Sequence, residues 1–491
     1  MKYLFLTLTL YFSVFFCFSQ TQYDNKTAFL EDLKIYREIV ETSHSGMYLY
    51  TTKNEFALMF RESIKKIEAN KIVSNRDFFL LISAIHSKIN CGHSSTYPTG
   101  KLFSNLEDNQ KSFFPLKVKF IKDTLIVASD YKGLKKGTQL IGINNKSIQE
   151  IKNDAFKIIS SDGYNTTFKY RQLENDFSQF YFLLYGKQEN FDLKIIPYQS
   201  SSLSNVTLES ISVQESEESK PTETIQKATD LSFPNEKTAL LTVNTFSTET
   251  RKNQRKFFKF LNRSFKEIQE KGIENLILDI RENTGGDDGN DMELASYLIN
   301  KPFKENKFRK LNTNELPLYP EYLHPQWKQM MGISKKKSSE DIKAALKNEI
   351  NKEFFQAEDG AFYFKEKSVI RRDPNQYLFS GKTYILTSGK VFSGGSLFSA
   401  LVRDKSNAIF VGEETGGGYY RHTGTIPLIY ALPNSEIVFS LFLVINEQDV
   451  EQQLFPQGSG IVPHYEVYPT IKDFVENKDA VLQFVKQKLE D

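Results

Sequence analysis

The segment TYILTSGKVFSGG, residues 383–395, joins a strand-like apolar run to a serine that is followed by two glycines. Helical spacing then resumes with Leu397, Phe398, Ala400, Leu401 and Val402. A serine in this position is either part of an ordinary Ser/Gly turn or a nucleophile that a tight strand-to-helix turn presents. The remaining segments of the chain must decide between these interpretations.

The same layout of strand, glycine turn and helix occurs at other places in the chain. Apolar strand patterns at 239–243, 276–280 and 408–412 alternate with helical patterns, and the last two strands run into the glycines 285–286 and 416–418. Alternating strands and helices predict an α/β core with a parallel sheet. Loops that follow parallel strands gather at one edge of the sheet, where ligands bind.

Four motifs in order resemble the C-terminal processing, or tail-specific, serine peptidase family. They are Asp-x-Arg-x-Asn-x-Gly-Gly at 279–286, Ser-Gly-Gly at 393–395, Gly-Glu-Glu-Thr-Gly-Gly at 412–417 and Gly-Ser-Gly-Ile-Val-Pro at 458–463. The resemblance covers most of the chain and implies a multidomain α/β fold. That fold has a helical N-terminal segment, a PDZ-like β-rich domain and a peptidase core of the ClpP/crotonase type.

The patterns and the resemblance together predict the domain organisation. We expect a signal peptide at 1–19, a helical domain at 20–110, a PDZ-like domain at 111–198 and a polar linker at 199–232. The peptidase core follows at 233–491, with an insertion at about 301–380 that is either a lid over the site or a surface decoration.

The N-terminus has the layout of an export signal. Lys2 precedes an apolar run from Tyr3 to Phe18, which is short for a membrane span, and a cut before Gln20 would leave Cys91 as the single cysteine. A retained anchor helix is the alternative. We therefore expect an exported protein, in the periplasm of a Gram-negative bacterium or outside the cell.

Composition excludes several classes of function. The 491 residues carry a formal net charge of +2, which gives no basic stripe for nucleic acid. The sequence has no His-Glu-x-x-His and no paired cysteine motif, so we expect no metal and no cofactor. The expected partner is a polypeptide substrate, which the family resemblance implies is recognised by its C-terminal tail.

The resemblance implies Ser393 as the nucleophile and restricts the choice of base. Many family members use a lysine about 25 residues after the serine, but that position is Gly418 and no lysine stands near it. Tricorn-like members instead take a histidine from the front of the chain, which corresponds to His93. A neutral imidazole can accept the serine proton, and the backbone amides of Gly394 and of Gly285 or Gly286 would form the oxyanion hole.

Other residues receive supporting roles. Asp279, Arg281 and Asn283 are expected to structure the glycine loop by hydrogen bonds. Gln457 stands where tricorn-like members have a glutamate that orients the histidine; the alternatives for that role are Ser94, Ser95 and Glu451. His464 replaces the usual aspartate after the final proline, and Cys91 is a rival nucleophile.

The predicted function is that of an exported serine endopeptidase. The alternative is a weak or inactive family member that binds peptide or a small apolar ligand.

Overall fold

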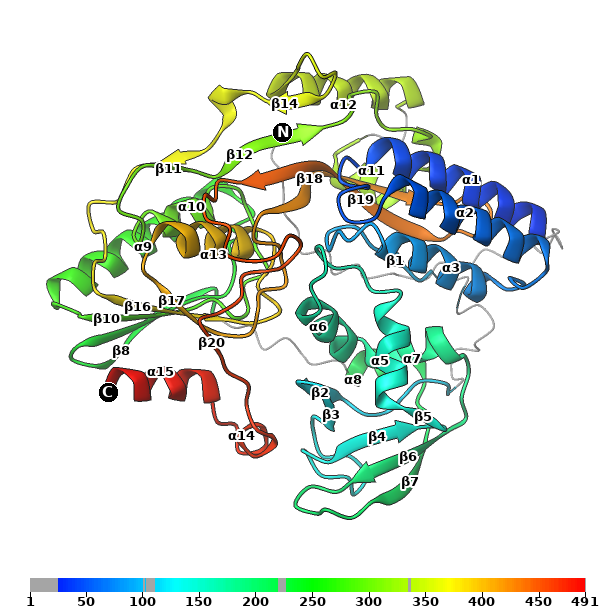
Figure 1. Cartoon of the computed structure of the whole chain (residues 1–491), viewed down its shortest axis with the longest axis horizontal. Coiled ribbons are helices and arrows are strands. Elements are labelled where there is room, and N and C mark those ends of the chain that lie inside the picture. Colours follow the sequence, from blue (N-terminus) through cyan, green and yellow to red (C-terminus); the bar gives the residue numbers. More distant parts are fainter. Residues whose placement is uncertain (1–24, 100–101, 103–110, 220–226, 334–336, 491) are drawn as a thin grey trace.

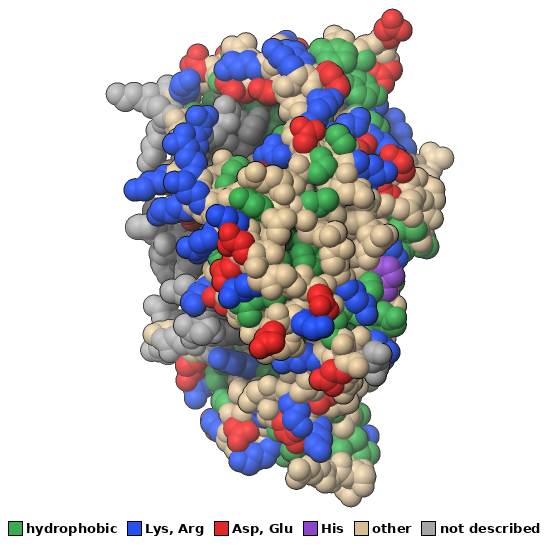
Figure 2. Space-filling view, turned by 90° about the vertical axis from the view of Figure 1, so that its left-hand side faces the viewer, with side chains coloured by type: hydrophobic (Ala, Val, Ile, Leu, Met, Phe, Trp, Pro, Cys, Tyr) green, Lys and Arg blue, Asp and Glu red, His purple; other side chains and the backbone are tan. Residues whose placement is uncertain are grey.

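The computed structural model describes residues 25–99, 102, 111–219, 227–333 and 337–490 of the chain (Figure 1). The expected signal peptide at 1–19 lies outside these residues. Within the described ranges, no helix combines the length and apolar character that a membrane crossing requires. Charged side chains of both signs are spread over the face in Figure 2, in keeping with the small net charge.

The front of the chain is helical, as the sequence predicts. It consists of α1 (Asn25–Ser43), α2 (Lys53–Glu68) and α3 (Asn75–Ser87). Helices α2 and α3 begin with capping boxes. The hydroxyl of Thr52 or Ser74 accepts a hydrogen bond from the N3 backbone N–H, and the N3 carboxylate accepts one from the backbone N–H of the N-cap residue. Each helix turns an apolar stripe inward.

A β-rich module follows the helices, in the lower right of Figure 1. Its sheet has the order β2-β3-β4-β6-β7, and β5 pairs with β4. The strands are β2 (Val118–Ile121), β3 (Thr124–Val127), β4 (Gln139–Ile143), β5 (Lys146–Ser147), β6 (Asn190–Ile196) and β7 (Ser204–Glu209). The accompanying helices are α5 (Ile148–Phe156), α6 (Thr167–Asn175) and α7 (Phe177–Tyr185).

The stretch 199–232, which we expected to be a polar linker, contains regular structure. It holds β7, α8 (Val213–Ser219) and the beginning of β8 (Thr229–Asn235). Strand β7 pairs with β6 at the edge of the module sheet, and Leu208 is the one buried side chain of that strand. An edge strand with so few buried positions lacks the apolar alternation that identifies strands in a sequence.

The α/β core is built on a sheet with the order β20-β17-β16-β10-β9-β8, in which neighbours are parallel apart from the pair β8 and β9. The further strands are β9 (Thr238–Val243), β10 (Asn275–Asp279), β16 (Lys382–Thr387), β17 (Ile409–Gly412) and β20 (Tyr465–Glu466). Successive side chains of β10 pack against opposite faces of this sheet. Leu276 and Leu278 pack in the cluster with α9 (Arg251–Glu270), whereas Ile277 packs with α15 (Ala480–Glu490). Helices α10 (Asn290–Ala295) and α13 (Gly394–Lys405) join the α9 side.

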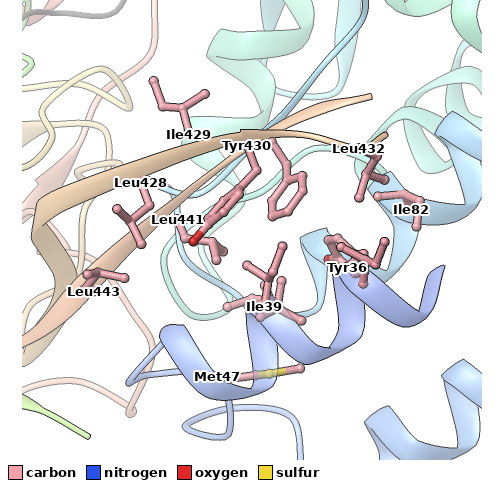
Figure 3. Packing of buried hydrophobic residues seen from close by; sticks show 14 of the residues in the cluster. Tyr36, Ile39, Met47, Ile82, Leu428, Ile429, Tyr430, Leu432, Leu441 and Leu443 are labelled. Carbon is pink, nitrogen blue, oxygen red and sulfur yellow. The ribbon is translucent and has the colours of Figure 1, made fainter. Parts of the chain in front are cut away.

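An antiparallel sheet connects the core with the helical front. Its order is β1-β19-β12-β14-β13, and β18 pairs with β19. Its strands are β1 (Thr96–Tyr97), β12 (Asn306–Leu311), β13 (Phe354–Gln356), β14 (Phe362–Phe364), β18 (Arg421–Ala431) and β19 (Val438–Gln448). Figure 3 shows Tyr36 and Ile39 of α1 facing Tyr430 and Leu441 of the β18–β19 hairpin.

The segment 301–380 supplies part of this antiparallel sheet. Strand β12 pairs with β19, and β13 and β14 form a hairpin around Asp359-Gly360. Helix α12 (Ser339–Glu353) starts with a capping box at Ser338. The other elements of this segment are β11 (Phe303–Lys304), η1 (Pro320–Tyr322), α11 (Pro325–Met330), η2 (Glu366–Ser368) and β15 (Arg371–Arg372). Outside the segment, the short helix α14 (Ile471–Val475) precedes α15.

Candidate active site

Ser393 stands on a strained turn between β16 and α13. It is the N-cap of α13 with φ 52° and ψ −124°, a backbone region that residues other than glycine rarely adopt. Such a conformation costs on the order of 1–3 kcal/mol and is concentrated at functional sites. The Ser393 side chain makes no capping hydrogen bond, and the residue is 8% exposed. Its hydroxyl is therefore free for chemistry.

The glycine loop after β10 lies directly against this turn, as the motif spacing predicts. A Cβ placed on Gly285, whose φ is 102°, would be 2.8 Å from both Ser393 Cβ and the Gly394 nitrogen. A Cβ on Gly286 would be 2.0 Å from the Ser247 nitrogen. Neither position has room for a side chain, so glycine is required for the two loops to approach.

The backbone amides near Ser393 are not equivalent. The Gly285 N–H donates to Asn283 Oδ1 at 2.9 Å and is therefore occupied. The N–H groups of Gly286 and Gly394 have no hydrogen-bond partner among the described residues, and both glycines line the same cavity as Ser393. Of the predicted oxyanion donors, Gly286 and Gly394 are thus available, and Gly285 serves the loop.

Asn283 ties the glycine loop to its surroundings. Its side chain is fully buried, and Nδ2 donates to the Val243 carbonyl at 3.1 Å while Oδ1 holds Gly285. Its carbonyl accepts the Phe392 N–H at 3.2 Å. One side chain and its backbone thereby connect β9, the glycine loop and the nucleophile turn.

Asp279 and Arg281 fix the start of the same loop. Arg281 Nε donates to Asp279 Oδ1 at 2.9 Å, and Nη1 donates to Asp479 Oδ1 at 2.8 Å. The Arg281 carbonyl accepts the Ser388 hydroxyl at 2.5 Å. The guanidinium therefore links the loop with the C-terminal segment before α15.

His93 lies beside the nucleophile turn but is not hydrogen-bonded to it. Its ring centroid is 4.5 Å from that of Phe392 and 5.3 Å from that of Phe442. Both ring nitrogens are buried, and neither has a hydrogen-bond partner within the part of the chain that the structure describes. Burial, and to a smaller extent His422, lowers the pKa of His93 well below its usual value. The imidazole is therefore neutral and has a free lone pair.

A second histidine, His422 on β18, lines the cavity together with Ser393. Its ring centroid is 5.5 Å from that of His93, and its buried Nδ1 has no hydrogen-bond partner among the residues described. Burial, with a contribution from Arg309, lowers the pKa of His422 to about 4. No sequence motif indicated a role for His422, although it lies four residues after Gly418, the position at which many family members have the lysine base.

Asp162 brings a carboxylate to the histidine from the β-rich module. It lies in the loop between α5 and α6, where Oδ1 accepts the Gly92 N–H at 2.7 Å and Oδ2 accepts the Gly418 N–H at 3.4 Å. Burial raises the pKa of Asp162 to about 7. Sequence reasoning missed this residue, because a polar Ser-Ser-Asp-Gly stretch has the composition of an ordinary turn.

Asp162, Cys91 and His93 form a compact group. One carboxylate oxygen, the thiol sulfur and one ring nitrogen all lie within 4.8 Å of one another. Burial, with a contribution from Asp162, raises the pKa of Cys91 to about 12, so its thiol stays protonated near neutral pH. A protonated thiol is a poor nucleophile, which disfavours Cys91 as the rival to Ser393.

None of the residues considered as orienters is hydrogen-bonded to the His93 ring, because neither ring nitrogen has a partner in the described part of the chain. Gln457 is exposed in the loop before Gly458. Ser94 Oγ accepts the Phe442 N–H at 3.2 Å, and the amide of Ser95 donates to Ser440. The Glu451 carboxylate lies 3.8 Å from Lys405 Nζ.

His464 has a structural contact. Its Nδ1 accepts the Phe410 N–H at 2.9 Å, which joins the final motif to β17.

Comparisons with known proteins identify the domain. Residues 237–467 match peptidase family S41. No curated protein matches the sequence. The fold is similar to the crystal structure of mature CPAF, with a TM-score of 0.60 and 13% identity over 94% of this chain and 96% of that chain. The structure of mature CPAF complexed with lactacystin gives a TM-score of 0.62 and 13% identity over 94% of this chain and 97% of that one.

The family match agrees with the resemblance inferred from the four glycine-rich motifs. An identity this low shows only that the folds are similar. The family match covers strands β9, β10, β16, β17 and β20 of the core sheet, the glycine loop and the Ser393 turn. The chain therefore carries a serine-type peptidase domain of family S41 at residues 237–467.

Proposed function

We propose that this protein is a serine endopeptidase that hydrolyses polypeptides with Ser393 as its nucleophile. The observation that carries the proposal is the free Ser393 hydroxyl on a strained turn beside two unbonded amides, those of Gly286 and Gly394. Backbone N–H donors of this kind stabilise the oxyanion that forms in acyl transfer. Removing one donor typically costs about 3–4 kcal/mol of transition-state stabilisation.

We propose His93 as the base, the role that the resemblance implies. His93 takes the proton from Ser393 Oγ as that oxygen attacks the peptide carbonyl, and then gives it to the leaving amine. Water hydrolyses the resulting ester by the same route. The neutral state of the ring and its place against Phe392, the residue before Ser393, support this assignment. A side-chain rotation must bring the ring to the hydroxyl when substrate binds.

His422 is the competing candidate for the base. It lines the cavity that contains Ser393, and its Nδ1 has no partner. Asp162 is the proposed positioning residue for His93, in the place that the sequence analysis gave to Gln457. Support comes from its carboxylate, which lies within 4.8 Å of a His93 ring nitrogen.

The finer features of the fold enter the proposal as hypotheses. We propose that the module at β2–β7 is PDZ-like and receives the C-terminal tail of a substrate as a strand added to its edge strand β7. At the other edge, Phe120 of β2 already donates its N–H to Glu174 and accepts a hydrogen bond from Arg171. We further propose that the core belongs to the ClpP/crotonase type, which its parallel sheet and helices support. Deleting the last residues of a cleaved substrate should raise KM if the tail is recognised, and an unchanged KM would refute tail recognition.

Export is proposed from the N-terminal sequence alone. Cleavage before Gln20 predicts a secreted or periplasmic protein whose intact mass corresponds to residues 20–491. An intact mass that includes the first residues would contradict it.

Cleavage of casein by purified protein tests the proposed reaction. Ser393→Ala should lower the rate by at least about 10³-fold. Ser399→Ala is the matched control on the same helix, because the Ser399 hydroxyl donates a hydrogen bond to the Gly395 carbonyl at 2.7 Å and has no role in the proposed mechanism. No cleavage by the wild type would favour the alternative of a peptide-binding family member. Equal rates for wild type and Ser393→Ala would place the nucleophile elsewhere.

A further inference from the structure

The cavity beside Ser393 has an acidic far wall. Its charged side chains are Asp287, Asp288, Asp291, Glu305 and Arg309. Four carboxylates and one guanidinium give a formal charge of −3 when all are ionised. The segment 301–380 forms one wall of the cavity, because Arg309 lies on β12 and Glu305 directly precedes that strand.

Most of these charges already have partners. Arg309 lies 2.5 Å from Glu305 and 3.3 Å from Asp288. Asp287 Oδ2 accepts hydrogen bonds from the amide and hydroxyl of Thr248 at 2.7 and 2.6 Å. Asp291 differs, because within the described residues no cation pairs with it. Its Oδ1 accepts the Gly289 N–H at 3.1 Å, and its Oδ2 is buried without a partner.

Three acceptors in the wall, on different elements, have no hydrogen-bond donor in the described ranges of the chain. They are Asp291 Oδ2, Asn306 Oδ1 and Asn446 Oδ1, on residues that are 3%, 3% and 2% exposed. Buried acceptors without donors are costly, so a ligand with N–H donors would be favoured there. Arg309 Nε and His422 Nδ1 also lack partners, but the Arg309 charge is neutralised by its two ion pairs.

The small volume of the cavity favours an ammonium group over a guanidinium group as its ligand. Its volume is about 20 Å³, which is room for one or two water-sized groups. An ammonium group has this size and offers three N–H donors, whereas a guanidinium is larger and planar. The carboxylates of this wall are not among the described groups whose ligand atoms converge within 4.8 Å, which disfavours a metal ion.

We infer that this cavity receives a primary ammonium group of the substrate next to the bond that Ser393 attacks, with Asp291 as its counter-charge. The inference rests on the proposed function and deepens it by naming the substrate class, polypeptides with such a group at the cleavage site. Two sources carry the same chemistry, a lysine side chain and a free α-amino terminus.

Ligand binding to Ser393→Ala protein tests the cavity without any need for catalysis. Three probes separate the sources: Nα-acetyl-lysine amide carries a side-chain ammonium, leucine amide a terminal one, and Nα-acetyl-norleucine amide none. We expect one of the first two to raise the melting temperature at pH 8 and the third to have no effect. Adding Asp291→Asn should abolish that rise, while Asp130→Asn, an exposed carboxylate on the β-rich module, should keep it. Equal responses to all three probes would overturn the inference.

Cleavage of a mixed peptide library by the wild type maps the same preference during turnover. Lysine should be enriched about 10- to 100-fold over norleucine at one position beside the cut, and Asp291→Asn should remove the enrichment. A preference for free N-termini would identify the terminal source. Cleavage with no preference for either would refute the inference and leave the peptidase proposal standing. If the library is left uncut but the probe response depends on Asp291, the peptidase proposal is refuted and the ammonium site stands.

Discussion

The serine side of the site comes from two neighbouring strands, whereas the histidine side comes from three distant parts of the chain. Ser393 follows β16 and the glycine loop follows β10, and these strands pair in parallel along five residues. His93 follows the helical front, Asp162 lies in the β-rich module, and His422 is on the β18–β19 hairpin. The serine side therefore needs one sheet register to form, and the histidine side needs the packing of several units.

The cost of each substitution should reflect this difference. The largest effect is expected for the base. His93→Ala should lower kcat/KM by about 10³–10⁴-fold, because nothing else in the proposed mechanism takes the serine proton. His422→Ala should lower it by less than about 10-fold, with the change mainly in KM. The two rates, measured side by side on casein, decide the assignment, and the reverse order would make His422 the base.

A smaller effect on rate is expected for the support of the serine side. Asn283→Ala leaves the Gly285 N–H and the Val243 carbonyl unpaired in the core. We expect the free energy of unfolding in urea to fall by about 2–4 kcal/mol and kcat to fall by about 100-fold. Asn253→Ala, at an exposed position on α9, should change stability by less than about 0.5 kcal/mol. Unchanged kcat in Asn283→Ala would mean that the glycine loop needs no such support.

The support of the histidine side should matter less. Asp162→Asn keeps an acceptor for the Gly92 N–H but removes the charge near His93. We expect kcat/KM to fall by about 10-fold at pH 8, with KM unchanged. A Gln457→Ala variant is the matched comparison and should stay within about 2-fold, since its side chain is exposed. A larger loss for Gln457→Ala than for Asp162→Asn would restore the orienter that the sequence predicted.

The smallest expected effect is a change in pH dependence. Burial holds the pKa of His93 well below its usual value, so the base remains neutral, and competent, while Asp162 titrates. The pKa of Asp162 is raised to about 7, so its carboxylate forms as pH rises through 7. Wild-type kcat/KM should therefore increase across pH 6–8, and Asp162→Asn should give a flat profile there. A rise that persists in the variant would assign it to another group.

The same difference explains what the sequence could predict. The core strands and the glycine loop beside Ser393 follow from local patterns, because neighbouring parallel strands bring their loops to one edge. Asn283, Asp279 and Arg281 were found in the same way, within one motif. The occupied amide of Gly285 was not foreseeable, since it depends on the direction of the Asn283 side chain.

The histidine side shows where prediction from sequence ends. The Asp162 carboxylate accepts a hydrogen bond from the amide of Gly418, which lies 256 residues further along the chain. No local sequence pattern indicates that contact. His422 reaches the cavity only because the β18–β19 hairpin leaves the core to pack on the helical front. The edge strand β7 was missed because one buried side chain leaves no periodicity to detect.

Covalent labelling tests the central claim most directly. Wild-type protein treated with a fluorophosphonate at pH 8 should carry one adduct, and peptide mapping by mass spectrometry should place it on Ser393, with the labelling rate reduced in His93→Ala. Recovery of the adduct on any other residue, or an unmodified Ser393 in protein that still cleaves casein, would contradict the account.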